Sequence, residues 1–397
     1  MNCPLKIHFF VQFVHEQGTY FRFHNLGAAL ARRGHEVEVF GCDNIPSNPK
    51  RTETRDGVVY HIRPSFRGQG WFHPFNHPLN ALYQIPAAMH RCDIAHLFQP
   101  FLTAAPAWML ARAKAKFYDW DDLWFGGMMS DNPTSFSARY FRGITGCLEK
   151  WLPRAADHVT TCSRFLSDLA TSRGAKTTTV IHNGFNRPEG PAMTPQFARH
   201  SLGLKQDAFY LGFMGRTLKE LDWCFDLLQA SMDEHPNLRL ALCGPDIGVL
   251  DDLHPDISAR IDHLGSIPAG KIPAFASAID LGLLPLEDSP FNRSRFPIKF
   301  AEYMLGETPV LASEVGECAE LGRSMPWVTL SGIGKDSWIS VGQEAIRSIL
   351  NGRYPRVALD ELLGIFTWDA IASTLERQYH DALDGTQMQP KTATDSL

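Results

Sequence analysis

Several features that would place this 397-residue sequence in other protein classes are missing from it. No stretch approaches the roughly 20 apolar residues of a membrane-spanning helix, and the first residues lack the apolar core of a signal peptide. The eight cysteines are scattered and form no CxxC pair, unlike a disulfide framework or a zinc site. We therefore expect a reduced, cytoplasmic protein, and any contact with a membrane would be peripheral.

Metal-binding and dinucleotide-binding signatures are also missing. Neither HExxH nor GxGxxG occurs. His73 and His77 stand four residues apart, but Pro74 and Pro78 argue against the helix that would align them, so we predict no metal. The net charge of −5 gives no support to a nucleic-acid partner.

Charge is distributed unevenly along the chain. Residues 1–190 contain 21 Lys and Arg against 15 Asp and Glu, whereas the remainder contains 17 against 28. The mildly basic first part suits an anionic acceptor or lipid headgroups. Ordinary surface variation explains it equally well, and the sequence leaves both interpretations open.

Short apolar runs alternate with amphipathic helical segments over most of the chain. This rhythm predicts parallel sheets covered by helices on both faces. The length suggests two such domains, which we expect at residues 1–190 and 201–365, joined by a Pro-rich linker over Asn186–His200. A helix over 366–384 would return to the first domain, and the polar tail 385–397 would be disordered. The predicted fold class is α/β, with two Rossmann-like doubly wound domains facing a central cleft.

The segment NRSRFPIKFAEYMLGETPV, from Asn292 to Val310, follows a strand-like run. Pro297 suits the first turn of a helix, and Lys299 and Glu302 then lie on one helical face. A helix N-terminus with an added ammonium group suits a diphosphate, and a carboxylate there can accept bonds from ribose hydroxyls. An i,i+3 salt bridge at an ordinary helix start is the simpler alternative. Gly306 would permit a left-handed cap.

This pattern, P-x-K-x-x-E-Y-x-x-G-x-x-P-V, resembles the nucleotide-binding segment of glycosyltransferase family 4 and its GT-B relatives. The resemblance implies that Glu302 binds the donor ribose and that Lys299 lies by the diphosphate. The family's glycine usually stands one place later, at Glu307. Many members also carry a Glu at the position of Ser294, whose contact with the donor sugar would pass here to Asn292 or to Glu287–Asp288.

A second segment, GFMGRTLKEL, resembles the family's G-R-x-x-x-x-K turn, in which Arg and Lys neutralise the diphosphate. Gly215 and Arg216 match this pattern. Leu221 stands where the Lys is expected, so Lys219 is the substitute. A basic group here would stabilise the negative charge of a departing diphosphate, although a surface Arg in a loop is the plain alternative.

Weaker matches fill out the resemblance. In the loop HEQGTYFR, Gly18 and Thr19 are candidates for contact with the donor phosphates, although a plain turn explains a lone glycine as well. Gly244 is expected to line the pocket for the nucleotide base, and backbone groups of Ser266 and Ile267 could contact the base.

Three carboxylates crowd one strand end in YDWDDLW. Asp119, Asp121 and Asp122 should face polar ligand groups, because burying them unpaired would be costly. Where many relatives have a His that contacts the transferred sugar, Asp121 or Asp119 stands here. Mutual repulsion could raise the pKa of one carboxyl group, which could then act in acid–base catalysis. Helix capping by these residues is the alternative.

The resemblance implies a metal-independent hexosyltransferase that moves a sugar from a nucleotide-diphosphate-sugar donor to an acceptor hydroxyl with retention. Glycan, polysaccharide or glycolipid synthesis would be its setting, with a glycan, lipid-linked or small-molecule acceptor. No cofactor is expected, because the nucleotide sugar is a substrate. A nucleotide-sugar epimerase of the same fold, and a degenerate non-catalytic binding subunit, remain as alternatives.

Overall fold

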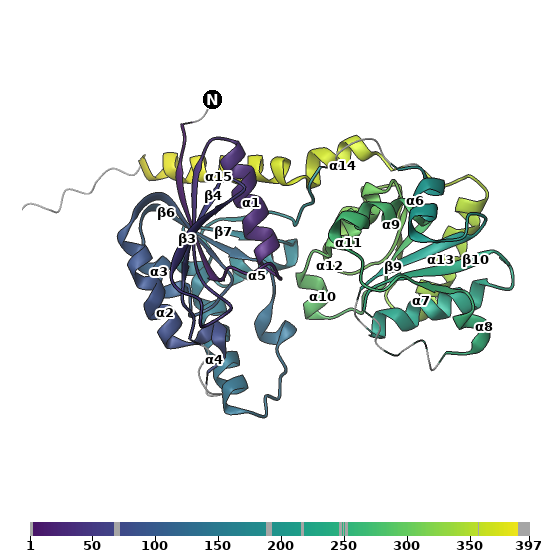
Figure 1. Cartoon of the computed structure of the whole chain (residues 1–397), viewed down its shortest axis with the longest axis horizontal. Helices are drawn as coiled ribbons and strands as arrows, with labels where there is room; N and C mark the ends of the chain where they lie inside the picture. Colours follow the sequence, from purple (N-terminus) through teal and green to yellow (C-terminus); the bar gives the residue numbers. More distant parts are fainter. Residues whose placement is uncertain are drawn as a thin grey trace, which may run out of the picture. The chain divides into compact units, whose positions relative to one another are not determined.

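The computed structural model describes residues 3–66, 72–187, 193–215, 218–245, 248, 250, 253–355 and 357–387, without the side chains of residues 218, 219, 269, 386 and 387. The chain divides into two compact units (Figure 1). Unit 1 combines residues 1–183 with 368–397, and unit 2 consists of residues 184–367.

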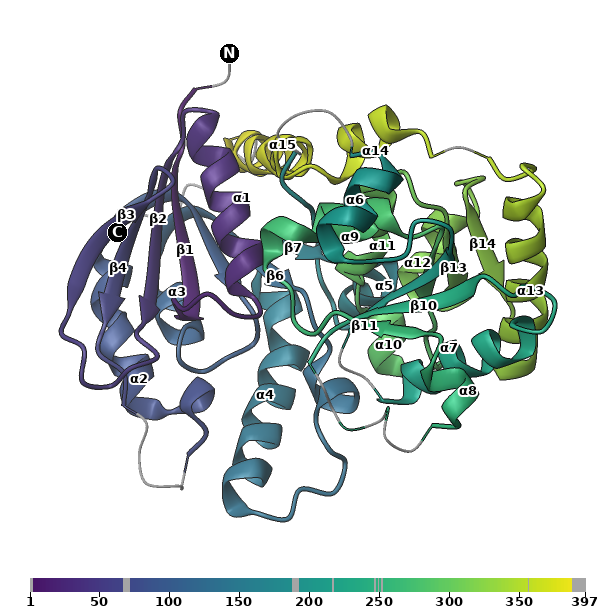
Figure 2. The ribbon, with the colours of Figure 1, turned by 45° about the vertical axis from the view of Figure 1, so that its right-hand side comes forward.

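Unit 1 is built on an eight-stranded sheet in the order β3-β4-β2-β1-β5-β6-β7-β8. All neighbouring strands pair in parallel except β3, which forms an antiparallel hairpin with β4. Figure 2 shows β1 to β4 side by side. The strands are β1 (Lys6–Phe13), β2 (Glu36–Cys42), β3 (Arg51–Arg55), β4 (Val58–Arg63), β5 (Arg91–Phe98), β6 (Arg112–Trp120), β7 (His158–Thr161) and β8 (Thr178–Val180).

The central strands of this sheet carry buried apolar residues on both faces, so helices cover both faces of the sheet. Ile7, Phe9 and Val11 of β1 pack in one core cluster with residues of α1 and α15, while α2 and α3 contact the sheet through β2, β1 and β5. The helices are α1 (Tyr20–Arg32), η1 (Pro74–Asn76), α2 (Pro78–Gln84), η2 (Ile85–Met89), α3 (Ala105–Leu110), η3 (Trp124–Met128), α4 (Phe136–Ala155), α5 (Arg164–Ser172) and α15 (Trp368–Gln387).

Unit 2 is built on a six-stranded, wholly parallel sheet in the order β11-β10-β9-β12-β13-β14. The strand order reverses between β9 and β12, the kind of switch point beside which open α/β sheets bind ligands. The strands are β9 (Phe209–Met214), β10 (Leu238–Cys243), β11 (Ile261–His263), β12 (Leu281–Leu284), β13 (Val310–Ser313) and β14 (Val328–Ser331).

One face of this second sheet forms a buried cluster with α7 and α13, and α11 contacts α9 and the strands β12 and β13. The helices are α6 (Pro195–Leu202), α7 (Leu218–Ser231), α8 (Pro255–Ser258), η5 (Ala269–Lys271), α9 (Ile272–Ala278), α10 (Pro290–Ser294), α11 (Ile298–Leu305), α12 (Gly316–Gly322), α13 (Lys335–Leu350) and α14 (Leu359–Phe366). Two parallel sheets with helical layers confirm the predicted fold class.

Two segments differ from the expectation. Residues 104–115 are mostly of types with high helix propensity, which predicts one helix, but α3 ends at Leu110 and residues 112–115 begin β6. Pairing with β5 overrides the helix propensity of this Ala-, Lys- and Arg-rich stretch. The predicted linker contains α6, which needs no long apolar stripe because Thr194 caps it, Pro195 opens it and Gly203 ends it at φ 71°.

The end of α11 also corrects an expectation. Gly306 is not left-handed, with φ −84° and ψ 9°. It is required for another reason, because a β-carbon there would lie 2.3 Å from the carbonyl carbon of Ala276. The left-handed residue is Glu307, with φ 58°, at the position where the family usually has glycine.

The C-terminal helix α15 lies in unit 1 and extends to Gln387, so the first residues of the predicted tail are helical. Residues 388–397 lie outside the described residues. The expected disorder of that tail therefore stays a prediction.

Candidate functional site

In unit 2, helix α11 brings its first turn against the end of the central strand β9. A β-carbon at Gly215 would lie 2.7 Å from Nζ of Lys299, so the ammonium group rests directly on the backbone after that strand. The same ammonium lies 4.6 Å from the ring centroid of Phe213, a cation–π contact. The structure therefore places Lys299 and Gly215, two of the predicted site residues, together at the carboxyl edge of the sheet.

Glu220 is the charged partner of Lys299, and Arg295 holds Glu220 from its other side. Oε2 of Glu220, in the first turn of α7, lies 3.6 Å from Nζ of Lys299. Arg295, four residues before Lys299, donates from Nη2 to the other carboxylate oxygen of Glu220 at 2.9 Å. Burial lowers the pKa of Lys299, and the Glu220 carboxylate opposes that shift. These three side chains carry a formal net charge of +1, which favours an anionic ligand.

Glu302 stands one turn along α11 from Lys299. Burial raises its pKa to about 7, against the attraction of the Lys299 ammonium. No hydrogen bond to its side chain occurs among the described residues. A half-buried carboxyl group without a partner can accept bonds from ligand hydroxyls, as the prediction for Glu302 requires.

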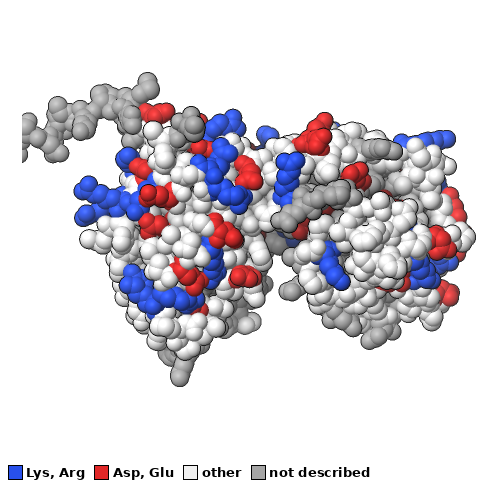
Figure 3. Space-filling model, turned by 45° about the horizontal axis from the view of Figure 1, so that its top comes forward, with Lys and Arg blue, Asp and Glu red and all other residues white. Residues whose placement is uncertain are grey.

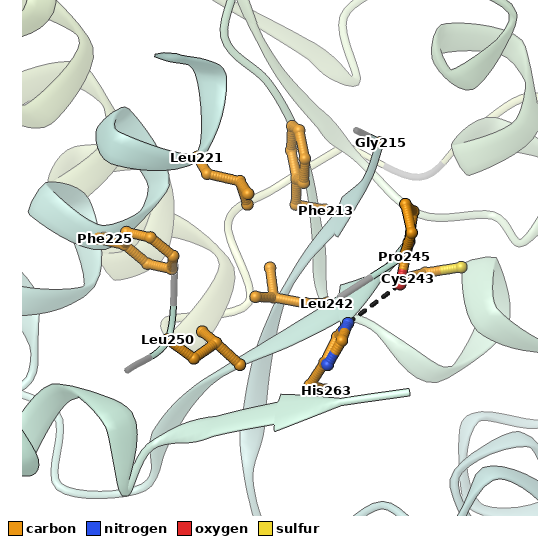
Figure 4. A pocket seen from close by; sticks show the side chains of 10 residues that line it. Phe213, Gly215, Leu221, Phe225, Leu242, Cys243, Pro245, Leu250 and His263 are labelled. Carbon is orange, nitrogen blue, oxygen red and sulfur yellow. Dashed lines mark hydrogen bonds between the residues drawn. The ribbon is translucent and has the colours of Figure 1, made fainter. Parts of the chain in front are cut away.

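Two glycines let the loops after β9 and β10 approach closely. A β-carbon at Gly244 would lie 2.1 Å from the carbonyl oxygen of Gly215. The ring of His263 hydrogen-bonds to the carbonyl oxygen of Gly244 at 3.0 Å, the dashed line of Figure 4. Any side chain at residue 244 would push these loops apart.

A mostly apolar pocket of about 330 Å³ opens beside these glycines. Figure 4 shows Phe213, Leu221 and Leu242 around it. Leu221, where the family pattern expects Lys, is thus a pocket-lining apolar residue. Beyond β11, Ser266 is exposed and Ile267 is half-buried. Their predicted backbone contacts with the base stay a prediction.

Ser294, which stands where the family usually has Glu, and the residues predicted to take over the contact of that Glu differ in their surroundings. Ser294 is fully buried, and its hydroxyl donates to the carbonyl oxygen of Phe291. Asp288 is paired with Arg293. Asn292 donates from Nδ2 to the carbonyl oxygen of Glu287 at 2.8 Å, and its buried Oδ1 has no hydrogen-bond partner among the described residues. Asn292 is therefore the better substitute on geometric grounds.

Two predicted residues remain untested by the structure. Arg216 lies outside the described residues. Lys219 belongs to α7, but its side chain also lies outside them. Their predicted contacts with a diphosphate stay predictions.

In unit 1, Asp119 is an internal anchor. Both of its oxygens accept bonds from Arg22, Oδ1 from Nε and Oδ2 from Nη2, each at 2.8 Å, and Oδ2 accepts a third from Thr160 at 2.6 Å. Arg22 and Asp119 are both almost fully buried. Arg22 also donates to the carbonyl oxygens of Ile181 and His182. With these bonds made, Asp119 holds the strand ends together.

Asp121 has a different environment. Its Oδ1 accepts a bond from Nδ2 of Asn183 at 3.1 Å and lies 3.8 Å from Nε of Arg22. Burial raises its pKa, and the Arg22 guanidinium opposes that shift. A raised pKa was predicted for one carboxyl group of this cluster, and the direction is confirmed for Asp121. The main cause is burial rather than the expected repulsion by Asp119, which contributes less.

Thr19 and Asp122, two other predicted residues of unit 1, both accept hydrogen bonds from the side chain of Gln99, which the sequence did not single out. Gly18 is left-handed at φ 57° and precedes Thr19. Gln99 donates to Oγ1 of Thr19 at 3.2 Å and to Oδ2 of Asp122 at 3.3 Å. The loops after β1, β5 and β6 are therefore linked at the carboxyl edge of the sheet.

Sequence reasoning missed Arg22, Gln99, Glu220 and Arg295. Arg295 had a signal, since it lies in the same basic segment as Lys299. Arg22 had none, because an Arg in an amphipathic helix is usually exposed. Glu220 and Gln99 acquire their roles through contacts far along the chain.

The structure also bears on the predictions about metal sites, membrane-spanning helices and surface charge. Among the described residues, no group of three or more His, Cys, Asp and Glu side chains is arranged to hold a metal ion. None of the helices that the structure describes combines the length and apolarity needed to cross a bilayer. On the face drawn in Figure 3, acidic and basic side chains are interspersed rather than gathered into one basic field.

Comparison with known proteins shows what this architecture is similar to. Residues 17–184 match the family model described as "Glycosyl transferase 4-like domain", and residues 206–329 match "Glycosyl transferases group 1". The chain is 22% identical over 258 residues to a teichuronic acid biosynthesis glycosyltransferase, TuaH, of Bacillus subtilis, covering 63% of this chain but only 62% of that protein. It is 23% identical over 411 residues to glycogen synthase of Mycobacterium tuberculosis, covering 93% and 92% of the two chains.

Solved structures share the fold. Sucrose-phosphate synthase from Thermosynechococcus elongatus superposes with a TM-score of 0.71 at 18% identity, covering 96% of this chain and 99% of that one. Anabaena HepE, solved with UDP and glucose, superposes with a TM-score of 0.62 at 17% identity, covering 95% and 100%. With two family models matched along one chain and these neighbours in fold, the chain belongs to the GT-B glycosyltransferases of the group 1 type.

Proposed function

We propose that this protein transfers a sugar from a nucleoside-diphosphate sugar to an acceptor hydroxyl, with retention at the anomeric carbon. The observation that carries the proposal is the Lys299 ammonium, which rests on the backbone of Gly215 at the carboxyl edge of the unit 2 sheet. Its excess positive charge, shared with Arg295, suits a diphosphate. The complex of HepE with UDP and glucose makes a uridine nucleotide the first donor to test.

In this scheme the bond between the anomeric carbon and the diphosphate oxygen breaks, a bond to the acceptor oxygen forms, and the proton of the acceptor hydroxyl passes to the departing diphosphate. Lys299 stabilises the charge that grows on the leaving diphosphate. Glu302 accepts bonds from the ribose, and Asn292 contacts the donor sugar through its unpartnered Oδ1. The nucleotide sugar is a substrate, and the scheme includes no further cofactor.

We assign the carboxylates of unit 1 to the transferred sugar and the acceptor. Asp121, whose pKa burial raises, and Asp122 are the groups that bind or exchange protons with sugar hydroxyls. Asp119 acts through Arg22 and is a positioning residue. The names of TuaH and glycogen synthase support a polysaccharide or another glycan as acceptor.

The test is binding of UDP-, GDP- and ADP-glucose to the whole protein, measured by calorimetry. Lys299→Met should weaken binding of the preferred donor roughly 10- to 100-fold, since a bond to a charged group contributes about 1.5–3 kcal/mol. Lys205→Met, which removes an exposed lysine of the same unit, is the matched control and should bind as the wild type does. Equal affinities in the two variants would contradict the diphosphate site.

A further inference from the structure

Gln99 has a backbone conformation that its sequence disfavours. Its φ is +67°, in the left-handed region, which costs a non-glycine residue roughly 1–2 kcal/mol. Pro100 follows it and restricts residue 99 further, toward extended conformations. The side chain is fully buried. Strain of this kind persists only where surrounding structure holds it, and it concentrates at functional sites.

Hydrogen bonds from neighbouring segments hold this residue. Its N–H donates to the carbonyl oxygen of Asp119 at 3.1 Å, and its carbonyl accepts from Phe101 at 3.0 Å. In the side chain, Oε1 accepts from Nε1 of Trp124 at 3.0 Å. Nε2 donates to both Thr19 and Asp122. Every polar atom of Gln99 is thus used, and a single amide group connects three loops.

Those loops come from β1, β5 and β6, and the switch in strand order of the unit 1 sheet lies between β1 and β5. The amide nitrogen of Gln99 orients the Asp122 carboxylate by donating to its Oδ2. Trp124 fixes which end of the amide is the donor, because an indole N–H can only donate to the oxygen.

We propose that Gln99 is a positioning residue, which orients Thr19 and Asp122 for sugar transfer and is kept in a strained backbone conformation for that purpose. This inference rests on the proposed function, because it takes Thr19 and Asp122 as site residues. It predicts a loss of turnover that is larger than any loss of nucleotide binding, since Lys299 and Glu302, the main groups assigned to the nucleotide, belong to unit 2.

The experiment uses the full chain and measures release of nucleoside diphosphate from the glucose donor that the wild type binds. Gln99→Met keeps the side-chain length but removes all three hydrogen bonds. It should lower kcat roughly 10- to 100-fold, the effect expected when reacting groups are misplaced by about 1 Å, with a smaller change in KM for the donor. Gln84→Met is the matched control, because Gln84 is also a buried glutamine of unit 1, bonded to the carbonyl oxygen of Val11.

A second variant gives a readout that a loss of stability would not produce. Gln99→Glu keeps the shape but places a carboxyl group against Asp122. Like charges raise the pKa of such a pair, and a protonated carboxyl group can still donate to Asp122. The kcat of Gln99→Glu relative to wild type should therefore rise as the pH is lowered.

The outcomes are distinguishable. A kcat for Gln99→Met equal to that of Gln84→Met, or a ratio of Gln99→Glu to wild type that does not change with pH, would overturn the role of Gln99 while leaving the transferase function intact. A wild-type protein that neither binds nor cleaves any of the three donors would instead overturn the proposed function, and the role of Gln99 with it.

Discussion

At Glu302, burial alters the protonation of a carboxyl group that we propose binds the donor. Its carboxyl group is partly ionised near neutral pH, because burial raises its pKa to about 7. Below that pH the folded protein holds a neutral acid, and above it a carboxylate that accepts bonds from hydroxyls more strongly. The same shift makes folding less favourable as the pH rises from about 4.5 toward 7, since the folded state then binds the additional proton.

We therefore predict that affinity for the donor increases about five- to tenfold between pH 6 and pH 8, the difference between a neutral and a charged hydrogen bond. Calorimetry with an intact nucleotide sugar is the suitable measurement, because its diphosphate has no terminal group that titrates in this range. Glu302→Gln should bind with an affinity that does not vary with pH. A variant that kept the wild-type slope would exclude Glu302 as its origin.

Asp119 and Asp121 show how neighbouring residues of one type acquire different tasks. Asp119 is neutralised by Arg22 through two hydrogen bonds, whereas Asp121 has an amide partner and a more distant guanidinium. Burial raises the pKa of Asp121, and the more distant Arg22 guanidinium only partly opposes that shift. Their positions in the sequence, two residues apart, do not distinguish these roles.

At the scale of the element, the position of α11 depends on the two residues that follow it, Gly306 and Glu307. Its last turn passes so close to α9 that only glycine fits at residue 306, while the left-handed conformation falls on Glu307. The helix must hold this position, because its first turn carries Lys299 and its middle carries Glu302. The unusual order of glycine and glutamate therefore follows from close packing against α9.

Substitutions at these two positions should act in opposite directions. Gly306→Ala should destabilise the protein by about 1–3 kcal/mol, because its methyl group would overlap the backbone of Ala276. Glu307→Gly should stabilise it by about 0.5–1 kcal/mol, the relief of left-handed strain less the entropy of glycine. Urea unfolding measures both changes. The explanation fails if Gly306→Ala is neutral or if Glu307→Gly is the more destabilising of the two.

At the scale of the whole molecule, the end of the chain completes the unit in which the chain begins. Ile371, Leu375 and Tyr379 of α15 belong to the core cluster of unit 1. The hydroxyl of Tyr379 hydrogen-bonds to His96 at 2.7 Å, His96 to Thr160 at 3.2 Å, and Thr160 to Asp119 at 2.6 Å. A buried chain of bonds thus connects α15 with the anchor of the candidate site.

Leu375→Ala should destabilise unit 1 by about 2–5 kcal/mol, the usual cost of removing a buried leucine side chain. Hydrogen exchange resolves where stability is lost, and we expect faster exchange of β1 amides with little change in β9. Leu110→Ala, at a leucine of the same unit that is 60% exposed, is the control. Equal acceleration in both units would show that α15 does not stabilise unit 1 selectively.

The sequence by itself determined the layered parallel sheets and the placement of Lys299 and Glu302 one turn apart on the same helix. Alternating apolar runs and an i,i+3 spacing are local properties, which neighbouring residues encode without reference to distant ones. The family resemblance added the chemistry of a nucleotide sugar to the same segment. Local pattern was less reliable at residues 112–115, where strand pairing overrode helix propensity.

Only the tertiary structure decided which groups hold the candidate site. Arg295 and Glu220 are 75 residues apart in sequence, and Arg22 and Asp119 are 97 apart. The strained turn at Gln99 depends on loops from three strands. Burial, ion pairing and the pKa values that follow from them depend on which distant side chains meet, and packing of the whole chain determines that.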